Sequence, residues 1–223
     1  MRHVERGLLA SGLLAAIMLT ASTAARAQQI GIPVLQNAFV NAGTTLGVDY
    51  GAGSDAYGAG IAAAWVPGNT TFQLNGGLGL YAPDHGGRSI AWGLRVMAPA
   101  PKLKGRSLGL AAFLGVGGTS VNGITEFRVP AGISIGYRRA LGTTHSVSGY
   151  VAPFYSWSRV STGGISSTHG LFRVAFGVDA VITPGLGATL GYETGTAARR
   201  GAPGPTGGIV GIGVSYLLLG RRR

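Results

Sequence analysis

The chain has 223 residues, 41 glycines, no cysteine and only 11% charged residues, yet its mean hydropathy is positive. The lack of cysteine excludes a disulfide framework, and so little charge is unusual for a soluble domain, in which about a quarter of residues are charged. The basic excess, 18 Lys and Arg against 7 Asp and Glu, is dispersed along the chain. A nucleic-acid binder would gather such charges on one face, so nucleic acid is not an expected partner.

Residues 1–27 have the pattern of a cleaved export signal. A basic start precedes an apolar stretch from Leu8 to Leu19, and Ala25 to Ala27 form a small-x-small cleavage site. The apolar stretch is too short to cross a bilayer as a helix, although an uncleaved anchor is the alternative. We therefore predict a mature chain that begins with a short N-terminal segment at 28–37.

The residues after this segment alternate between apolar and small or polar side chains. From Glu126 to Arg138, for example, one face is apolar and the other is small or charged, which is the period of a strand. Similar segments recur between breakers rich in Gly, Pro and Asn. The predicted strands are roughly 38–50, 55–66, 70–81, 89–98, 107–117, 125–138, 146–158, 169–182, 186–196 and 207–218.

This pattern predicts an all-β fold, a transmembrane antiparallel up-and-down β-barrel of ten strands over residues 38–218, followed by a basic tail at 219–223. After the export signal no apolar run reaches 18 residues, so lipid contact would fall on alternate strand positions. Eight strands remain possible if the first pair is lost. With an even number of strands both ends lie on one side, and the longer connections at 82–88, 118–124, 159–168 and 197–206 become outer loops.

Two prolines fall inside predicted strands, where each removes a donor from the ladder. Folding the strands at 125–138 and 146–158 back about residue 142 would place Pro130 and Pro153 within one position of each other. We therefore predict one bulge shared by both prolines.

The last predicted strand ends Gly-Ile-Gly-Val-Ser-Tyr-Leu-Leu at Leu218. It resembles the C-terminal assembly signal of bacterial outer-membrane barrels, and the mature chain resembles the small OmpA-like and OmpX-like barrels. The resemblance implies the outer membrane of a Gram-negative-type bacterium, contact with membrane lipids, and recognition by the export and barrel-assembly machinery. The last apolar position is a leucine rather than an aromatic residue, and five residues follow it. The residues that match the signal are Gly213, Val214, Ser215, Tyr216 and Leu218.

Charged side chains also occur on the face predicted to line the bore. An unpaired charge in a narrow lumen of low dielectric is costly, so we expect a bore that is largely plugged by small side chains and an ion-pair network. A selectivity or ligand site is the alternative. The predicted network is Asp49, Arg95, Glu126, Arg128, Arg138, Arg173, Asp179 and Glu193.

No constellation in the sequence indicates catalysis or a cofactor. Asp84 and His85 are adjacent, so their side chains point apart, and His145 and His169 have no acid at a readable spacing. Isolated histidines without cysteine do not predict a metal site. We predict a non-enzymatic outer-membrane barrel, structural or narrow and pore-forming. The alternatives are a surface binding or adhesion module that uses its outer loops and, less favoured, a lipid-active barrel enzyme.

Overall fold

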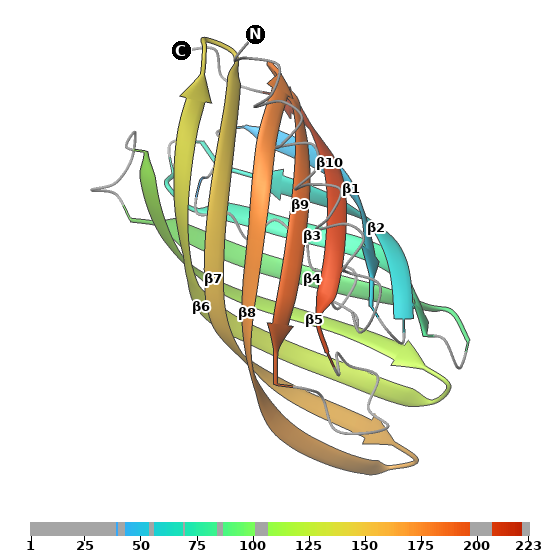
Figure 1. Cartoon of the computed structure of the whole chain (residues 1–223). Coiled ribbons are helices and arrows are strands. Elements are labelled where there is room, and N and C mark those ends of the chain that lie inside the picture. The colour runs from blue at the N-terminus through green and yellow to red at the C-terminus, as the bar shows by residue number, and fades with distance from the viewer. Residues whose placement is uncertain are drawn as a thin grey trace, which may run out of the picture.

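The computed structural model describes residues 39, 43–53, 56–68, 70–83, 87–100, 107–196 and 207–219. These residues form ten antiparallel strands, each paired with its neighbours in the chain, and β1 also pairs with β10 so that the sheet closes on itself (Figure 1). The strands are β1 (Thr44–Ala52), β2 (Ala56–Trp65), β3 (Gln73–Pro83), β4 (Ser89–Pro99), β5 (Leu108–Val121), β6 (Ile124–Leu141), β7 (His145–Thr162), β8 (Ile165–Thr183), β9 (Leu186–Gly195) and β10 (Ile209–Leu219).

The prediction of an all-β, up-and-down barrel is therefore confirmed, with ten strands rather than eight in the described chain. β1 begins and β10 ends at the same end of the barrel, where Thr44 is the register partner of Leu219. The export signal at 1–27, the segment at 28–37 and the tail after Leu219 lie outside the described residues. No described helix is both long and apolar enough to cross a membrane.

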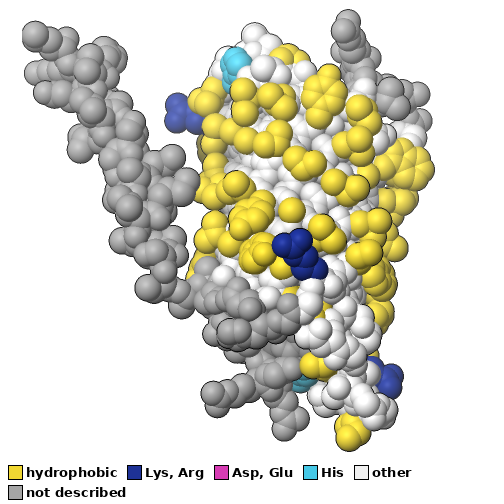
Figure 2. Space-filling model, turned by 90° about the vertical axis from the view of Figure 1, so that its right-hand side faces the viewer, with side chains coloured by type: hydrophobic (Ala, Val, Ile, Leu, Met, Phe, Trp, Pro, Cys, Tyr) yellow, Lys and Arg dark blue, Asp and Glu magenta, His cyan; other side chains and the backbone are white. Residues whose placement is uncertain are grey.

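The barrel wall is apolar on the outside. In β4 the side chains of Ile90, Trp92 and Leu94 are exposed, whereas Ser89 and Arg95 are buried on the inside, as the two-residue period of a strand requires. The same alternation runs through the other strands, and Figure 2 shows hydrophobic side chains spread over the wall. An apolar exterior of this extent is suited to lipid rather than to water, so the fold is a transmembrane barrel.

Four consecutive strands are much longer than the rest. β5 to β8 have 14, 18, 18 and 19 residues, whereas β1 to β4, β9 and β10 have 9 to 11. A tilted strand needs only about 9 to 11 residues to cross a bilayer, and β8 is about 60 Å long at roughly 3.3 Å per residue. The β5–β6 and β7–β8 hairpins therefore extend past the apolar belt, at the end opposite the start of β1 and the end of β10 (Figure 1).

This length corrects the predicted loops at 118–124 and 159–168. Asn122 and Gly123 both have positive φ, as do Gly163 and Gly164, and two such residues make the tight turn that suits a hairpin. Pairing therefore continues to the last residues before each turn, Val121 with Ile124 and Thr162 with Ile165. The glycines that predicted loops form the turns themselves.

The shared bulge predicted for Pro130 and Pro153 is wrong. Pro130 lies opposite Ser156, three positions away from Pro153. The β5–β6 ladder is interrupted beside Pro130 and the β6–β7 ladder beside Pro153, and each ladder resumes in the same register. Each proline thus turns its missing donor towards a different neighbouring strand, and the two defects are absorbed separately.

Large side chains fill the middle of the lumen, and glycines make room for them. Gly132 lies between Phe113 and Phe154 on one inward row of register partners, and the two phenyl rings meet with their centroids 6.0 Å apart. A Cβ at Gly132 would lie 2.5 Å from the carbonyl oxygen of Pro153. Together with neighbouring side chains these rings form a buried cluster of Met97, Ala111, Phe113, Tyr150, Ala152, Phe154 and Ala175.

Another inward row, separated from this one by the row of Ala111 and Ser134, consists almost entirely of glycine. Tyr150 is part of this row, and its ring occupies the space that a side chain at Gly177 would fill. A ring that lies across the bore in this way requires partners without side chains on the adjacent strands. The glycines of this row are Gly51, Gly58, Gly109, Gly136, Gly177, Gly191 and Gly211.

We predict that Gly132→Ala lowers the free energy of unfolding by about 1–3 kcal/mol, because the added methyl overpacks the contact between β6 and β7. The measurement is urea unfolding in lipid vesicles, followed by tryptophan fluorescence. Gly149→Ala is the matched control, since the nearest atom to its Cβ, the oxygen of Gly177, is 3.8 Å away. Equal losses in both variants would contradict the packing role of Gly132.

Candidate functional site

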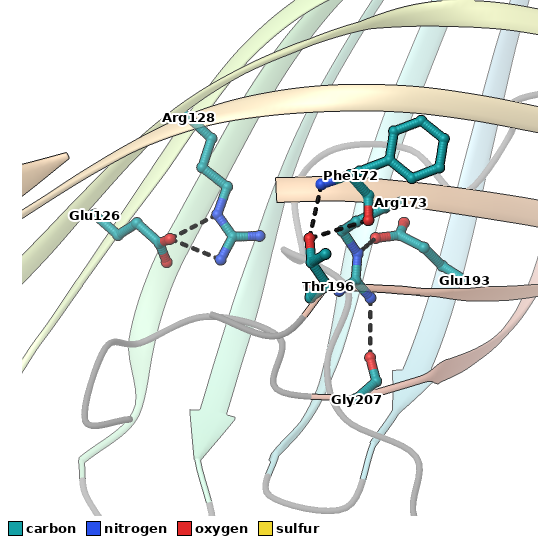
Figure 3. A network of polar contacts seen from close by, with 7 residues as sticks. All are labelled: Glu126, Arg128, Phe172, Arg173, Glu193, Thr196 and Gly207. Atoms are coloured by element: carbon teal, nitrogen blue, oxygen red, sulfur yellow. Dashed lines mark hydrogen bonds and ion pairs between the residues drawn. The ribbon is translucent and has the colours of Figure 1, made fainter. Parts of the chain in front are cut away.

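A charged layer lies in the half of the lumen nearest the long hairpins, which we call the outer half; the half nearest the start of β1 we call the inner half. Glu126 and Arg128 are two residues apart on β6 and therefore point to the same side of the strand. The Nε of Arg128 donates to Glu126 Oε1 at 2.7 Å, and Ser158 Oγ on β7 donates to the same oxygen at 2.7 Å (Figure 3 shows the ion pair). Glu126 and Ser158 are completely buried. The carboxylate is thus fixed by groups from two strands.

A second ion pair joins β8 to β9. Arg173 Nε donates to Glu193 Oε1 at 2.5 Å, and the other two guanidinium nitrogens donate to the carbonyls of Thr196 at 3.0 Å and Gly207 at 2.9 Å (Figure 3). Arg173 is almost fully buried. Thr196 and Gly207 flank the connection between β9 and β10, so a single guanidinium holds both ends of that connection.

Arg95 links this charged layer to the aromatic cluster. Its guanidinium lies 5.4 Å from the ring centroid of Phe113, a cation–π arrangement, and it is attracted electrostatically by Glu193. The side chain is buried. Arg95 therefore sits where the polar and the aromatic fillings of the bore meet.

The remaining predicted charges lie towards the other end of the lumen, near the start of β1. Thr189 Oγ1 donates to Asp179 Oδ1 at 2.6 Å, and the guanidinium of Arg138 lies 4.3 Å from the ring centroid of Phe39. Asp49 faces Gly60 on β2. The structure thus places the eight predicted residues inside the bore, but divides them into an outer group around the two Arg–Glu pairs and an inner group around Arg138 and Asp179.

Sequence reasoning missed the aromatic filling of the bore. Phe113, Tyr150 and Phe154 are buried in the lumen, where a packing of small residues was expected. The sequence did contain a signal for this. Phe113 lies between Ala112 and Leu114, which face outward, so the alternation of a strand places its ring in the lumen. The role of Phe39 was missed as well, because the predicted first strand began at residue 38, whereas β1 begins at Thr44.

Of the residues considered for catalysis, the structure describes His145 and His169. His145 is exposed at the start of β7, and His169 lies opposite the buried Ser158, although its ring nitrogens have no hydrogen-bond partner among the described residues. Asp84 and His85 lie outside the described residues. Among the residues described, no three His, Asp or Glu side chains are grouped so as to hold a metal ion. The predicted assembly signal, Gly213 to Leu218, is part of β10.

Comparison with known proteins places the chain beside bacterial barrels. No family model matches the sequence, and no curated protein matches it. Neisserial surface protein A is 14% identical over 79% of this chain and 98% of its own, with a TM-score of 0.40. The β domain of the Bordetella autotransporter BrkA is 18% identical over 80% and 100%, with a TM-score of 0.49, and the KdgM porin 8% identical over 77% and 98%, with a TM-score of 0.39. At these values, function must be argued from the lumen and the apolar belt of this chain.

We predict that Glu193→Gln lowers the free energy of unfolding by about 3–5 kcal/mol, because it leaves the buried charge of Arg173 without its counter-ion. The double variant Arg173→Met/Glu193→Leu should lose less, since both charges are removed together. Arg159→Gln, at an exposed arginine, should change stability by no more than about 0.5 kcal/mol. Urea unfolding in vesicles measures all three, and a loss in Glu193→Gln no greater than in Arg159→Gln would show that the pair is not buried.

Proposed function

We propose that this protein is a non-enzymatic β-barrel of the outer membrane of a Gram-negative-type bacterium, and that its lumen is closed to solutes. The apolar belt supports insertion in a membrane, and the export signal and the C-terminal strand pattern in the sequence support the outer membrane. On this proposal the protein contacts membrane lipids and is delivered by the export and barrel-assembly machinery. Its role is structural rather than that of an open pore.

The observation that carries this proposal is the filling of the bore by two successive layers. The aromatic cluster around Phe113 and Phe154 occupies the middle, and the Arg–Glu pairs occupy the outer half. Opening a path would require the rings to leave their packing and the arginines to leave their partners. Separating a buried pair alone costs about 3–5 kcal/mol, so a conducting state would be sparsely populated.

A second candidate function, surface binding, is favoured by the long hairpins. β5 to β8 continue past the belt as a paired sheet, and this sheet carries small polar side chains, including Ser120, Thr125, Ser161, Ser166 and Thr168. A rigid sheet held away from the membrane offers a surface for a partner without the entropy cost of ordering a loop. A closed barrel would then serve as the anchor of the sheet.

We predict that the purified protein produces no current steps in a planar bilayer. The triple variant Arg95→Ala/Phe113→Ala/Phe154→Ala should conduct, because it removes three large side chains from the middle of the bore. The matched control is Phe172→Ala/Phe176→Ala, which truncates two outward-facing rings of the belt and should remain silent. Regular current steps from the unmodified protein would overturn the closed-barrel proposal.

We also predict that the long hairpins face the cell exterior. The chain has no cysteine, so single cysteines can be introduced without background labelling. Ile165→Cys, at the 75% exposed tip of the β7–β8 hairpin, should react on intact cells with a thiol reagent that cannot cross membranes. Thr143→Cys, exposed in the β6–β7 turn at the opposite end, should react only after lysis. The reverse pattern would show that the orientation is inverted.

A further inference from the structure

We propose that the inner end of the lumen, near the start of β1, holds a binding site for a small zwitterion of the α-amino-acid class. A cavity of about 220 Å³ lies there. Drug-sized sites usually measure about 300–1,000 Å³, so this cavity is suited to a molecule of roughly one amino acid. The residues that line it include Phe39, Met97, Arg138, Asp179, Leu186 and Thr189.

Polar side chains of opposite charge line one continuous row of this cavity. Register partners on the adjacent strands β6 to β9 place Arg138, Ser148, Asp179 and Thr189 side by side on the lumen face. A guanidinium and a carboxylate separated by one strand stand roughly 10 Å apart at the backbone, and both side chains line the same cavity. The row therefore offers a positive and a negative anchor with a hydroxyl between them.

The arginine retains donor capacity for a ligand. The ring of Phe39 lies over the guanidinium of Arg138, which leaves the edge of the guanidinium plane for in-plane hydrogen bonds. Its Nε is buried, without a hydrogen-bond partner among the described residues. Because Arg138 lines the cavity, a ligand there would meet the guanidinium from its two Nη groups. A planar guanidinium binds a carboxylate through two parallel bonds, so the group that best completes Arg138 is a carboxylate.

The carboxylate of Asp179 supplies the complementary anchor. It accepts a hydrogen bond from Thr189 and attracts the guanidinium of Arg138. A carboxylate accepts several hydrogen bonds at once, so the ammonium group of a ligand would join the groups that already surround it. The side chains of Met97 and Leu186 provide apolar wall beside the charged row. An α-amino acid with an apolar side chain matches all three features: a carboxylate for Arg138, an ammonium for Asp179, and a hydrocarbon group for the wall.

This site is separate from the Arg–Glu pairs that plug the outer half of the bore, and ligand binding there does not depend on whether the barrel conducts. A current measurement and a binding measurement can therefore fail independently. The neighbouring residue Arg139 is exposed on the opposite face of β6, so it offers a charge-matched control one position away.

The test uses the full chain folded in detergent and saturation-transfer NMR with L-leucine as the probe. We expect saturable binding that weakens at least tenfold in Arg138→Gln and in Asp179→Asn, and that is unchanged in Arg139→Gln. N-acetyl-leucine, which lacks the ammonium, and leucine amide, which lacks the carboxylate, should each bind at least tenfold more weakly. Heat-modifiable migration on a detergent gel verifies that every variant is folded.

Three results would overturn the proposal: no saturable binding of L-leucine to the folded protein, equal binding of the two blocked derivatives, or a loss in Arg139→Gln as large as that in Arg138→Gln. If Arg138→Gln does not fold, Arg138→Lys provides the second variant. It keeps the charge but removes the planar fork, and it should still weaken binding several-fold. Unchanged binding in Arg138→Lys would show that the fork does not hold the ligand.

Discussion

The structure depends on closure of the backbone hydrogen-bond ladder. In hydrocarbon no water is available to satisfy an exposed N–H or carbonyl, so a sheet in a membrane cannot leave an edge within the bilayer. The pairing of β1 with β10 removes that edge. The two interior prolines are compatible with closure because each interrupts a single ladder, on different strand pairs, without a change of register. A closed wall must face lipid on the outside and enclose its inward side chains, and these two requirements shape the rest of the barrel.

Closure fixes the width of the bore, and the side chains that point inward must then fill it. The abundance of glycine is explained in part by this packing. The glycines around Tyr150 and the one between Phe113 and Phe154 lack side chains where rings lie across the lumen. A lumen lined by medium-sized residues at every position would be overpacked, whereas one lined only by glycine would remain an open channel. In this barrel, glycines alternate with large aromatic side chains, and this arrangement fills the bore.

Local alternation was sufficient to predict the strands, their two faces and the closed all-β fold, because sidedness is a property of each strand alone. Register is not local. Placing the β6–β7 turn one residue too early moved the expected partner of Pro130 by two positions, since a shift of the turn centre acts on both strands. The predicted lengths of the hairpins were wrong for a related reason. Asn122 and Gly123 have the composition of a loop but the conformation of a two-residue turn.

The same distinction governs the charged side chains. The alternation of strand positions was enough to place these side chains inside the bore. Which charged side chains contact each other is decided by register and by the tilt of the strands. Arg173 and Glu193 meet across β8 and β9, and the carbonyls of Thr196 and Gly207 complete the hydrogen bonding of the arginine. At the other end Arg138 is stacked on Phe39 and lines a cavity. Desolvation penalises an unsatisfied charge in both places. Protein groups complete the hydrogen bonding of Arg173, whereas Arg138 is attracted by Asp179 and, on our proposal, also binds the carboxylate of a ligand. A buried guanidinium whose donors are bonded within the fold holds its strands together, whereas one that lines a cavity can bind a ligand.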